Sequence, residues 1–364
     1  MPSDTKSAVN SRKMPIGATW EEPTLTVPPY MPSMGKITAK KKKYTAFSFF
    51  SGTGGSSTGL KMAGFAVLYA NEFVPNALHN YRLNAPDTVV DKRDIRKVRG
   101  PELLKKFGLK RGQLDLLEGS PPCKAFSHAQ ARKGGDDFGK VIPYSEGVKQ
   151  RVDDLFFDQI RLIEYLKPRT ISLENVDGLA RHVDRGILIE VIEKLEDAGY
   201  VVEARILDGA FLGVPQHRRR LIIVGVRKDI VKKLGVHPVF PKPNKREATV
   251  AEHLPHIVKI RTPRGFESAN QAYGTITASD HSIGYTALFS NGAWVETKDG
   301  TRRRFPIGEL KRMFSFPDDF KLEGSFIQQF ERLGRSHLPM QMYRVASMIA
   351  KEILEPWHEY LESR

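Results

Sequence analysis

The chain has 364 residues, of which 40% are hydrophobic, and a formal net charge of +15. No apolar run approaches the ~18 residues of a membrane span, the first residues lack the apolar segment of a secretory signal, and a single cysteine excludes both an intramolecular disulfide and a cysteine-rich zinc site. We therefore expect a cytoplasmic protein without a metal or a membrane segment, and the basic charge favours a polyanionic partner.

The predicted elements begin at Tyr44, after a Pro-, Ser- and Lys-rich segment, 1–43, that we expect to be a flexible basic arm. Alternating strands and helices then predict an α/β domain with a mainly parallel sheet. After Arg227 short β-like pieces predict a smaller domain, and a final helix at 338–354 is expected to pack on the first domain. The expected strands are 44–50, 66–72, 87–95, 113–119, 170–176, 201–207 and 220–226, and two amphipathic helices are expected at 152–168 and 187–200.

A glycine-rich turn, FFSGTGGSSTGL, lies between the first expected strand and a helix. A phosphate-binding P-loop needs lysine where Leu60 stands, and a dinucleotide-binding turn needs glycine where Ser57 stands. A plain strand–helix turn is the ordinary interpretation of the motif taken singly. The alternative is a site for a nucleoside cofactor without a large phosphate group, such as S-adenosylmethionine.

Three residues at strand ends favour the cofactor interpretation. Glu72 ends the second expected strand, where an acidic side chain can accept hydrogen bonds from ribose hydroxyls. Phe73 beside it can stack on adenine, and Asp94 near the end of the third strand can accept from the adenine amino group. The ordinary interpretation of Glu72 is a surface glutamate. The combination of the three residues at successive strand ends favours a cofactor site instead.

The only cysteine, Cys123, lies in GSPPCKAFS directly after the fourth expected strand. A lone cysteine is more often inert than catalytic. However, Glu174 in LENV ends the fifth strand at the same sheet edge, and Gln216, Arg218 and Arg220 alternate along the start of a later strand, so they share one face. Their ordinary interpretations are a surface carboxylate and a solvated basic cluster.

Together these side chains match nucleophilic addition to a pyrimidine. The attacking species is a thiolate, which nearby arginines favour. Attack on C6 of cytosine moves charge into the ring, where a carboxyl group at N3 can donate a proton and an arginine can stabilise O2.

With these motifs in this order, the chain resembles the bacterial DNA (cytosine-5) methyltransferases of restriction–modification systems over about residues 44–355. The matching motifs are FSGTGG, ANEF, RDI, GSPPCKAFS, LFFDQIR, LENV, QHRRR, RFPIGELKRMFSFPDDF and RLGRSHLP. The resemblance implies a Rossmann-like S-adenosylmethionine-dependent methyltransferase domain, 44–228 with 323–364, and a smaller β-containing target-recognition domain, 229–322.

The resemblance also implies roles for individual residues. Cys123 would attack C6 of a cytosine flipped out of the duplex. Glu174 would engage N3 of that base and Arg220 would reach its O2, while Arg218 would help to hold the loop that carries Cys123. No metal is expected, and the cofactor product would be S-adenosylhomocysteine. The cofactor site would comprise Phe50, Gly52, Gly54, Glu72, Phe73, Asp94, Pro122, Leu155 and Ser336, and the DNA-facing residues would be Lys124, Ser127, Gln216 and Arg312.

Three residues depart from the family pattern. Phe49, before the glycine-rich turn, stands where the family usually has aspartate. Lys124 replaces the usual glutamine after the cysteine, and Arg335 replaces the asparagine of the closing motif. The implied partners are double-stranded DNA, bound by a monomer, and a cognate restriction endonuclease. The alternatives are a tRNA cytosine-5 methyltransferase, which the sequence PCKAFS disfavours because that branch reads PCQPFT, and a catalytically silent DNA-binding relative.

A first prediction concerns Cys123→Ala. Because the chain has no other thiol, this change should abolish methyl transfer and leave cofactor binding largely intact. DNA that carries 5-fluorocytosine should trap a covalent complex with the unaltered chain, because fluorine cannot leave C5 as the proton does. Full activity of the alanine variant would contradict the assignment of the nucleophile.

Overall fold

The computed structural model describes residues 31–121, 141–143, 149–151, 155–180, 185–278 and 293–364. Most of the expected flexible arm lies outside these residues. Its last part is folded: helix α1 (Met34–Ala39) begins after the Ser33 cap and buries Ile37 against Met62.

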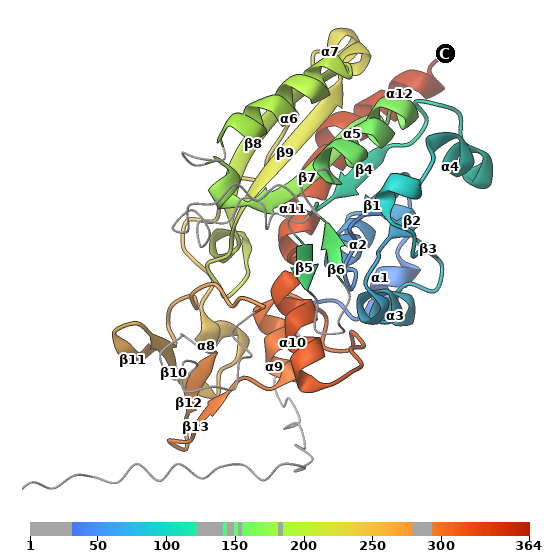
Figure 1. Ribbon diagram of the computed structural model, residues 1–364. Coiled ribbons are helices and arrows are strands. Elements are labelled where there is room, and N and C mark those ends of the chain that lie inside the picture. The colour runs from blue at the N-terminus through green and yellow to red at the C-terminus, as the bar shows by residue number, and fades with distance from the viewer. Residues whose placement is uncertain (1–30, 122–140, 144–148, 152–154, 181–184, 279–292) are drawn as a thin grey trace, which may run out of the picture.

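A seven-stranded sheet forms the centre of the larger domain, in the order β3-β2-β1-β4-β7-β9-β8 (Figure 1). In this sheet β9 runs antiparallel to β7 and β8, and the other adjacent strands are parallel, so the expected α/β fold with a mainly parallel sheet is confirmed. The bounds are β1 (Tyr44–Phe49), β2 (Phe65–Asn71), β3 (Val89–Asp91), β4 (Leu116–Gly119), β7 (Thr170–Val176), β8 (Tyr200–Asp208) and β9 (Arg219–Arg227).

Two strands are shorter than expected for local reasons. The third ends at Asp91 because Asp94 instead caps a 3-10 turn, Ile95–Lys97, by accepting from the Arg96 N–H. The fourth begins only at Leu116, since a turn through Gly112 (φ 86°) precedes it.

Helices cover both faces of the sheet, which explains why its strands are apolar on both sides (Figure 1). Neighbouring residues such as Ala46 and Phe47 enter different cores. On one face lie α4 (Gly100–Phe107), α5 (Leu155–Leu166) and α6 (Arg185–Asp197), and on the other α2 (Gly55–Met62), α7 (Lys228–Leu234), α11 (Pro339–Ile349) and α12 (Glu355–Glu362), while α3 (Pro75–Asn84) lies beside β2.

The final helical segment packs back on the larger domain, as predicted. It is not one continuous α-helix, because a π-helical turn, Ala350–Leu354, separates α11 from α12. None of the helices in the described ranges is both long and apolar enough to cross a bilayer.

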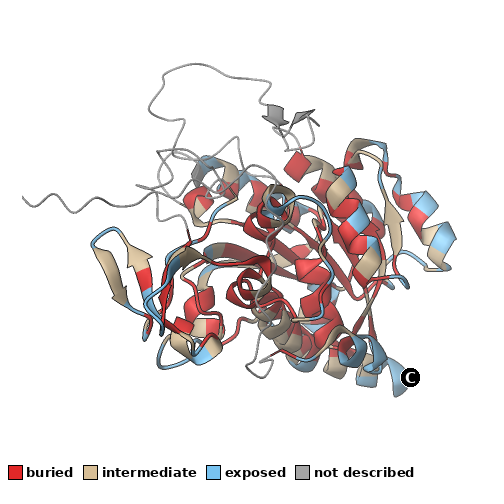
Figure 2. Cartoon of the chain, turned by 90° about the horizontal axis from the view of Figure 1, so that it is seen from below, coloured by how far each residue is buried: buried red, intermediate tan, exposed pale blue. Residues whose placement is uncertain are grey.

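The smaller domain has its own antiparallel sheet, in the order β11-β10-β12-β13, and its own core. That core also draws in Val214 before the domain and Phe330 and Leu333 after it, so buried contacts cross both expected boundaries. Buried residues concentrate in the interior of the molecule, and exposed residues lie along its outer helices and loops (Figure 2). Its elements are α8 (Val250–His253), β10 (Ile257–Thr262), β11 (Gly265–Ser268), β12 (Trp294–Thr297), β13 (Arg302–Arg304), α9 (Ile307–Met313) and α10 (Phe326–Arg335), and a separate hairpin comprises β5 (Val141–Pro143) and β6 (Lys149–Arg151).

Helix α2 approaches α11 closely because Gly59 has no side chain. A Cβ atom there would lie 2.4 Å from the Pro339 carbonyl oxygen and 2.8 Å from the Met342 Cβ. These neighbours include backbone atoms, so they cannot move aside cheaply.

Gly59→Ala should therefore destabilise the fold, by about 1–3 kcal/mol for overpacking. Gly186→Ala is the matched control, since nothing lies within 4 Å of a Cβ added in α6, and alanine favours a helix. Denaturant unfolding measures both. Equal stability of the two variants would contradict the close α2–α11 contact.

Candidate active site

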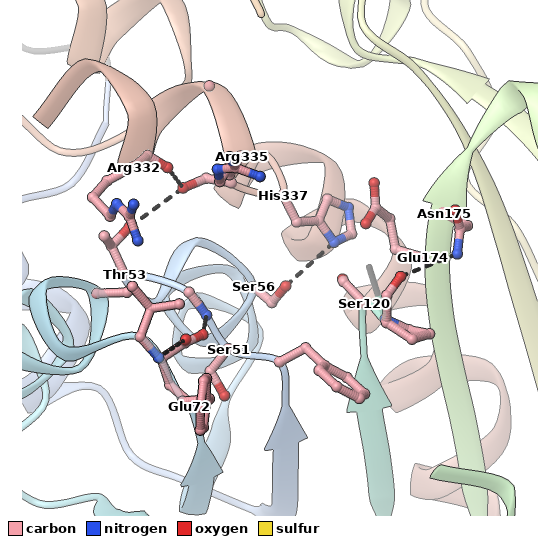
Figure 3. A pocket seen from close by; sticks show the side chains of 18 of the residues that line it. Ser51, Thr53, Ser56, Glu72, Ser120, Glu174, Asn175, Arg332, Arg335 and His337 are labelled. Carbon is pink, nitrogen blue, oxygen red and sulfur yellow. Dashed lines mark hydrogen bonds between the residues drawn. The ribbon is translucent and has the colours of Figure 1, made fainter. Parts of the chain in front are cut away.

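A pocket opens at the carboxyl ends of β1, β2, β4 and β7 (Figure 3). Its walls come from the glycine-rich turn after β1, the start of β9 and the segment that joins α10 to α11. Residues as far apart as Phe50 and His337 therefore line one cavity. Ligands of open α/β sheets bind at this edge.

Glu72 is held in the pocket by the backbone around it. Its carboxylate accepts the Gly52 N–H and the Val74 N–H, each at 2.7 Å. Burial raises the pKa of Glu72, and these hydrogen bonds and the charge of Arg332 oppose the rise. Glu72 is thus not a surface glutamate, and its oxygens retain capacity to accept hydrogen bonds from a ligand.

The glycine-rich turn depends on left-handed backbone at three positions: Phe50 (φ 53°), Gly52 (φ 55°) and Gly54 (φ 102°). Such a conformation in phenylalanine is unfavourable and is found mainly at functional sites. Phe50 lines the pocket, together with Phe73 and the predicted Ser336, whose hydroxyl lies 3.3 Å from the Thr53 hydroxyl.

Three of the residues predicted to bind the cofactor do not line the pocket. Gly54 lies against the Tyr81 ring, where a Cβ would be 3.2 Å from a ring carbon. Asp94 pairs with Arg96, and its neighbour Ile95 reaches the pocket instead. Leu155 is fully buried in the main core because it begins α5 beneath the sheet.

Glu174 and Arg220 form an ion pair on the far wall, with 2.8 Å between Oε1 and Nε. The antiparallel pairing of β7 with β9 brings them together, since Val176 pairs with Arg220 in register. Burial acts to raise the pKa of Glu174, but the nearby His337, Arg220 and Arg218 lower it more, so the pKa lies below its usual value.

Arg218 connects three segments beside this pair. Its guanidinium donates to the carbonyl oxygens of Ile276 at 3.2 Å, Gly334 at 2.8 Å and Ser336 at 3.0 Å. Burial lowers the pKa of Arg218, and the charge of Arg220 adds to this effect. Arg218 therefore joins the smaller domain and the closing segment to the start of β9.

The structure does not support direct DNA contacts for Gln216 and Arg312. Gln216 is fully buried, donates to the Met313 carbonyl at 2.6 Å and accepts from the Ile276 N–H at 3.2 Å. Arg312 is 1% exposed and donates to both carboxylate oxygens of Asp318. Gln216 is therefore buried away from the pocket, whereas Arg218 and Arg220, the other residues of the alternation, line it.

Four predicted residues, Pro122, Cys123, Lys124 and Ser127, lie outside the described residues, as does most of the segment 124–154. The structure describes the chain up to Pro121, whose carbonyl accepts from Asn175 Nδ2 at 3.2 Å. The segment that leads to Cys123 therefore starts beside Glu174, at the edge of the pocket.

His337 is a pocket residue that sequence reasoning did not single out. It is 5% exposed, and its Nδ1 lies 3.3 Å from the Ser56 hydroxyl. Burial lowers the pKa of His337 to about 4, so the imidazole is neutral near pH 7. The only signal in the sequence was its place in the unusual closing motif, where Arg335 also lines the pocket and donates to Glu331 at 2.8 Å.

The pocket suits a nucleoside better than a metal ion. Phe50 and Phe73 offer aromatic faces and Glu72 offers acceptors for hydroxyls. Within the described residues, no three His, Cys, Asp or Glu side chains gather where they could hold a metal.

Residues 44–283 match the model of the C-5 cytosine-specific DNA methylase family. Similar curated proteins include the type II methyltransferase M.PspPI of a Psychrobacter species, 29% identical over 81% of this chain and 76% of that protein. Another is M1.HphI of Haemophilus parahaemolyticus, 27% identical over 84% of this chain and 87% of that protein.

Solved structures with the same fold include DNMT2 of Spodoptera frugiperda, with a TM-score of 0.61 and 18% identity over 85% of this chain and 100% of that one. Dnmt2 of Schizosaccharomyces pombe has a TM-score of 0.57 and 16% identity over 87% and 99% of the two chains. At these identities the likeness concerns the fold alone. The family match covers well over half of the chain, so this protein belongs to the C-5 cytosine-specific DNA methylases, enzymes that transfer a methyl group from S-adenosylmethionine to carbon C5 of cytosine in DNA.

Proposed function

We propose that the pocket joins a cofactor half, around Phe50 and Glu72, to a cytosine half, around Glu174 and Arg220. The observation that carries this proposal is the Glu174–Arg220 ion pair, which lines the same cavity as Glu72. Glu72 would accept hydrogen bonds from the cofactor's hydroxyls, and Glu174 would face the edge of the cytosine. Methyl transfer to a cytosine needs both a cofactor site and a base site in this way.

The cofactor half is assigned to Phe50, Gly52, Glu72, Phe73 and Ser336. Glu72 would accept from the ribose hydroxyls while Gly52 and Val74 hold its carboxylate in place. S-adenosylmethionine supplies an electrophilic methyl group on its sulfonium. The Thr53 and Ser336 hydroxyls, 3.3 Å apart in the pocket lining, connect the turn to the segment between α10 and α11 beside the cofactor half.

In the cytosine half, the Cys123 thiolate would form a bond to C6 while Glu174 donates to N3 and Arg220 to O2. C5 then becomes nucleophilic and accepts the methyl group. Loss of the C5 proton to solvent and expulsion of the thiolate restore the C5–C6 double bond. Arg218 acts as a positioning residue, since its donors are bound to backbone carbonyls.

The target base must leave the helix first, which costs a few kcal/mol of stacking and pairing. We assign the offsetting DNA contacts to Lys124 and Ser127 in the loop and to the antiparallel sheet of the smaller domain, 229–322. That sheet and its β10–β11 turn carry partly exposed basic side chains: Arg264 is 79% exposed and pairs with Glu267, while Arg302 at 59% and Lys259 at 46% both pair with Glu296. Such residues bind phosphates and fix the position of the protein on the duplex.

The two relatives named above are type II methyltransferases. We therefore infer that this enzyme methylates one specific double-stranded sequence, as a monomer in the cytoplasm, and protects it from a cognate restriction endonuclease. The endonuclease is a functional partner and need not bind the methyltransferase.

Bisulfite sequencing of DNA from cells that produce the chain tests this proposal. Cytosines at one recurring sequence should resist bisulfite conversion. In cells that produce the Cys123→Ala variant, no cytosine at that sequence should be protected. Protection at unrelated sequences would contradict the specificity. Methyl transfer to tRNA but not to DNA would favour the RNA alternative, and cofactor binding without any transfer would favour a silent relative.

A further inference from the structure

A second carboxyl group lies directly beneath the pocket. Glu118, in β4, is 1% exposed, and its Oε2 accepts from the Ser48 hydroxyl at 2.6 Å. Ser48 in turn accepts from the Ser51 hydroxyl at 3.0 Å. Within the described part of the chain, Glu118 forms no ion pair, and its other oxygen, Oε1, has no hydrogen bond of good geometry.

This environment favours the protonated form of Glu118. A buried carboxyl group without a cation beside it loses hydration when it ionises. Burial raises the pKa of Glu118 to about 7, although the hydroxyls of Ser48 and Ser56 oppose the rise, and the charge of Glu174 adds to it. Glu118 therefore holds a proton on many molecules near neutral pH.

Glu174, in contrast to Glu118, is ionised near neutral pH and has no proton to donate. His337, Arg220 and Arg218 keep its pKa below the usual value, so it is a carboxylate near neutral pH. N3 of a neutral cytosine is a hydrogen-bond acceptor, and a carboxylate only accepts. A proton must therefore reach Glu174 before it can donate to N3 during attack at C6.

The sheet places Ser120 beside Glu174 and two residues along the chain from Glu118. Within the described residues, the Ser120 Oγ and the Glu118 Oε1 are both buried and have no hydrogen-bond partner. Glu118 pairs in register with Ser172 and Gly119 with Leu173, so Ser120 follows level with Glu174 on the neighbouring strand. Side chains two residues apart share a face of a strand, and Ser120 helps to lower the pKa of both Glu118 and Glu174.

We propose that Glu118 stores a proton beneath the pocket and passes it through the Ser120 hydroxyl to Glu174 when a cytosine occupies the site. The Glu118 O–H bond breaks as Ser120 takes that proton, and Ser120 gives its own proton to the Glu174 carboxylate. Glu118 ends as a carboxylate and Glu174 as the acid that donates to N3. The transfer reverses when the C5–C6 double bond is restored.

Groups from other elements surround this relay. His337 and the two arginines, Arg218 and Arg220, act on Glu174. Tyr81 from α3 interacts with Glu118 through charge, and burial raises the pKa of Tyr81 well above neutrality, so it stays uncharged. Because His337 is already neutral above a pH of about 4, Glu118 is the group in this cluster that titrates near neutral pH.

The test compares Glu118→Gln with the unaltered enzyme in single-turnover methyl transfer at saturating cofactor and DNA. Glu118 is protonated below its pKa, so its contribution is present at low pH and is lost as the pH rises through about 7. The ratio of the two rates should be about tenfold or more near pH 6 and should approach one near pH 9. The ratio removes the separate pH dependence of the Cys123 thiolate.

Two further variants keep the test decisive if glutamine destabilises the fold. Ser120→Ala should give the same pH-dependent loss, because it interrupts the relay and leaves Glu118 in place. Ser48→Ala should shift the falling limb of the rate to higher pH, because the lost hydrogen bond had lowered the pKa of Glu118. A ratio that is constant with pH in all three variants would overturn the proposal and leave Glu118 a structural residue.

The inference rests on the proposed role of Glu174 at N3, and Glu174→Gln separates the two. An inactive Glu174→Gln variant with a pH-independent ratio for Glu118→Gln refutes only the relay. A fully active Glu174→Gln variant refutes the proposed role of Glu174 and the relay with it.

Discussion

The reversal of one strand decides where the chemistry of this enzyme can occur. Because β9 runs antiparallel to β7, its first residues meet the last residues of β7. Arg220 at the start of one strand thereby reaches Glu174 at the end of the other. A parallel β9 would have carried its arginine to the opposite edge of the sheet, away from the glycine-rich turn and the start of the nucleophile loop.

The buried guanidinium of Arg218 extends this arrangement to the rest of the molecule. It binds carbonyls of Ile276 in the smaller domain and of Gly334 and Ser336 in the closing segment. A buried cation needs its donors satisfied, so these segments are held together at the pocket. Gln216 adds bonds to Met313 and Ile276. The domain proposed to read DNA is thus anchored within a few residues of the proposed reaction centre.

Three buried carboxyl groups around the pocket differ because their neighbours differ. Glu72 is oriented by backbone N–H groups, Glu174 by cations and Glu118 by serine hydroxyls alone. Environments that push apart the pKa values of neighbouring acids are the usual way in which one site holds both a proton donor and an acceptor. The same residue type can therefore serve binding, acid catalysis and proton storage within one cavity.

Local pattern was enough to predict much of this protein. Strand and helix periodicity predicted the α/β fold. The motifs predicted Glu72, Glu174 and Arg220 at one sheet edge, because the residues near each position along the chain are enough to locate where a strand ends. Period-two spacing says which residues share a face but not what covers that face, so it did not indicate that Gln216 bonds to Met313 and Ile276 in the interior. The DNA-facing role of Arg312 came from the resemblance, and the structure buries this side chain against Asp318. Leu155, which the resemblance implied for the cofactor site, lies in the main core because it begins α5.

The sequence by itself determined the order of elements, the family and the residue types available for chemistry, because these depend on neighbours along the chain. Only the tertiary structure decided that His337 lines the pocket and that Glu118 is buried against Ser48, since these contacts join segments 281 and 70 residues apart. It also decided their protonation, because a pKa depends on burial and on charges brought together by folding. The spacing of residues along the chain predicts neither the burial of a side chain nor the charges that folding brings next to it.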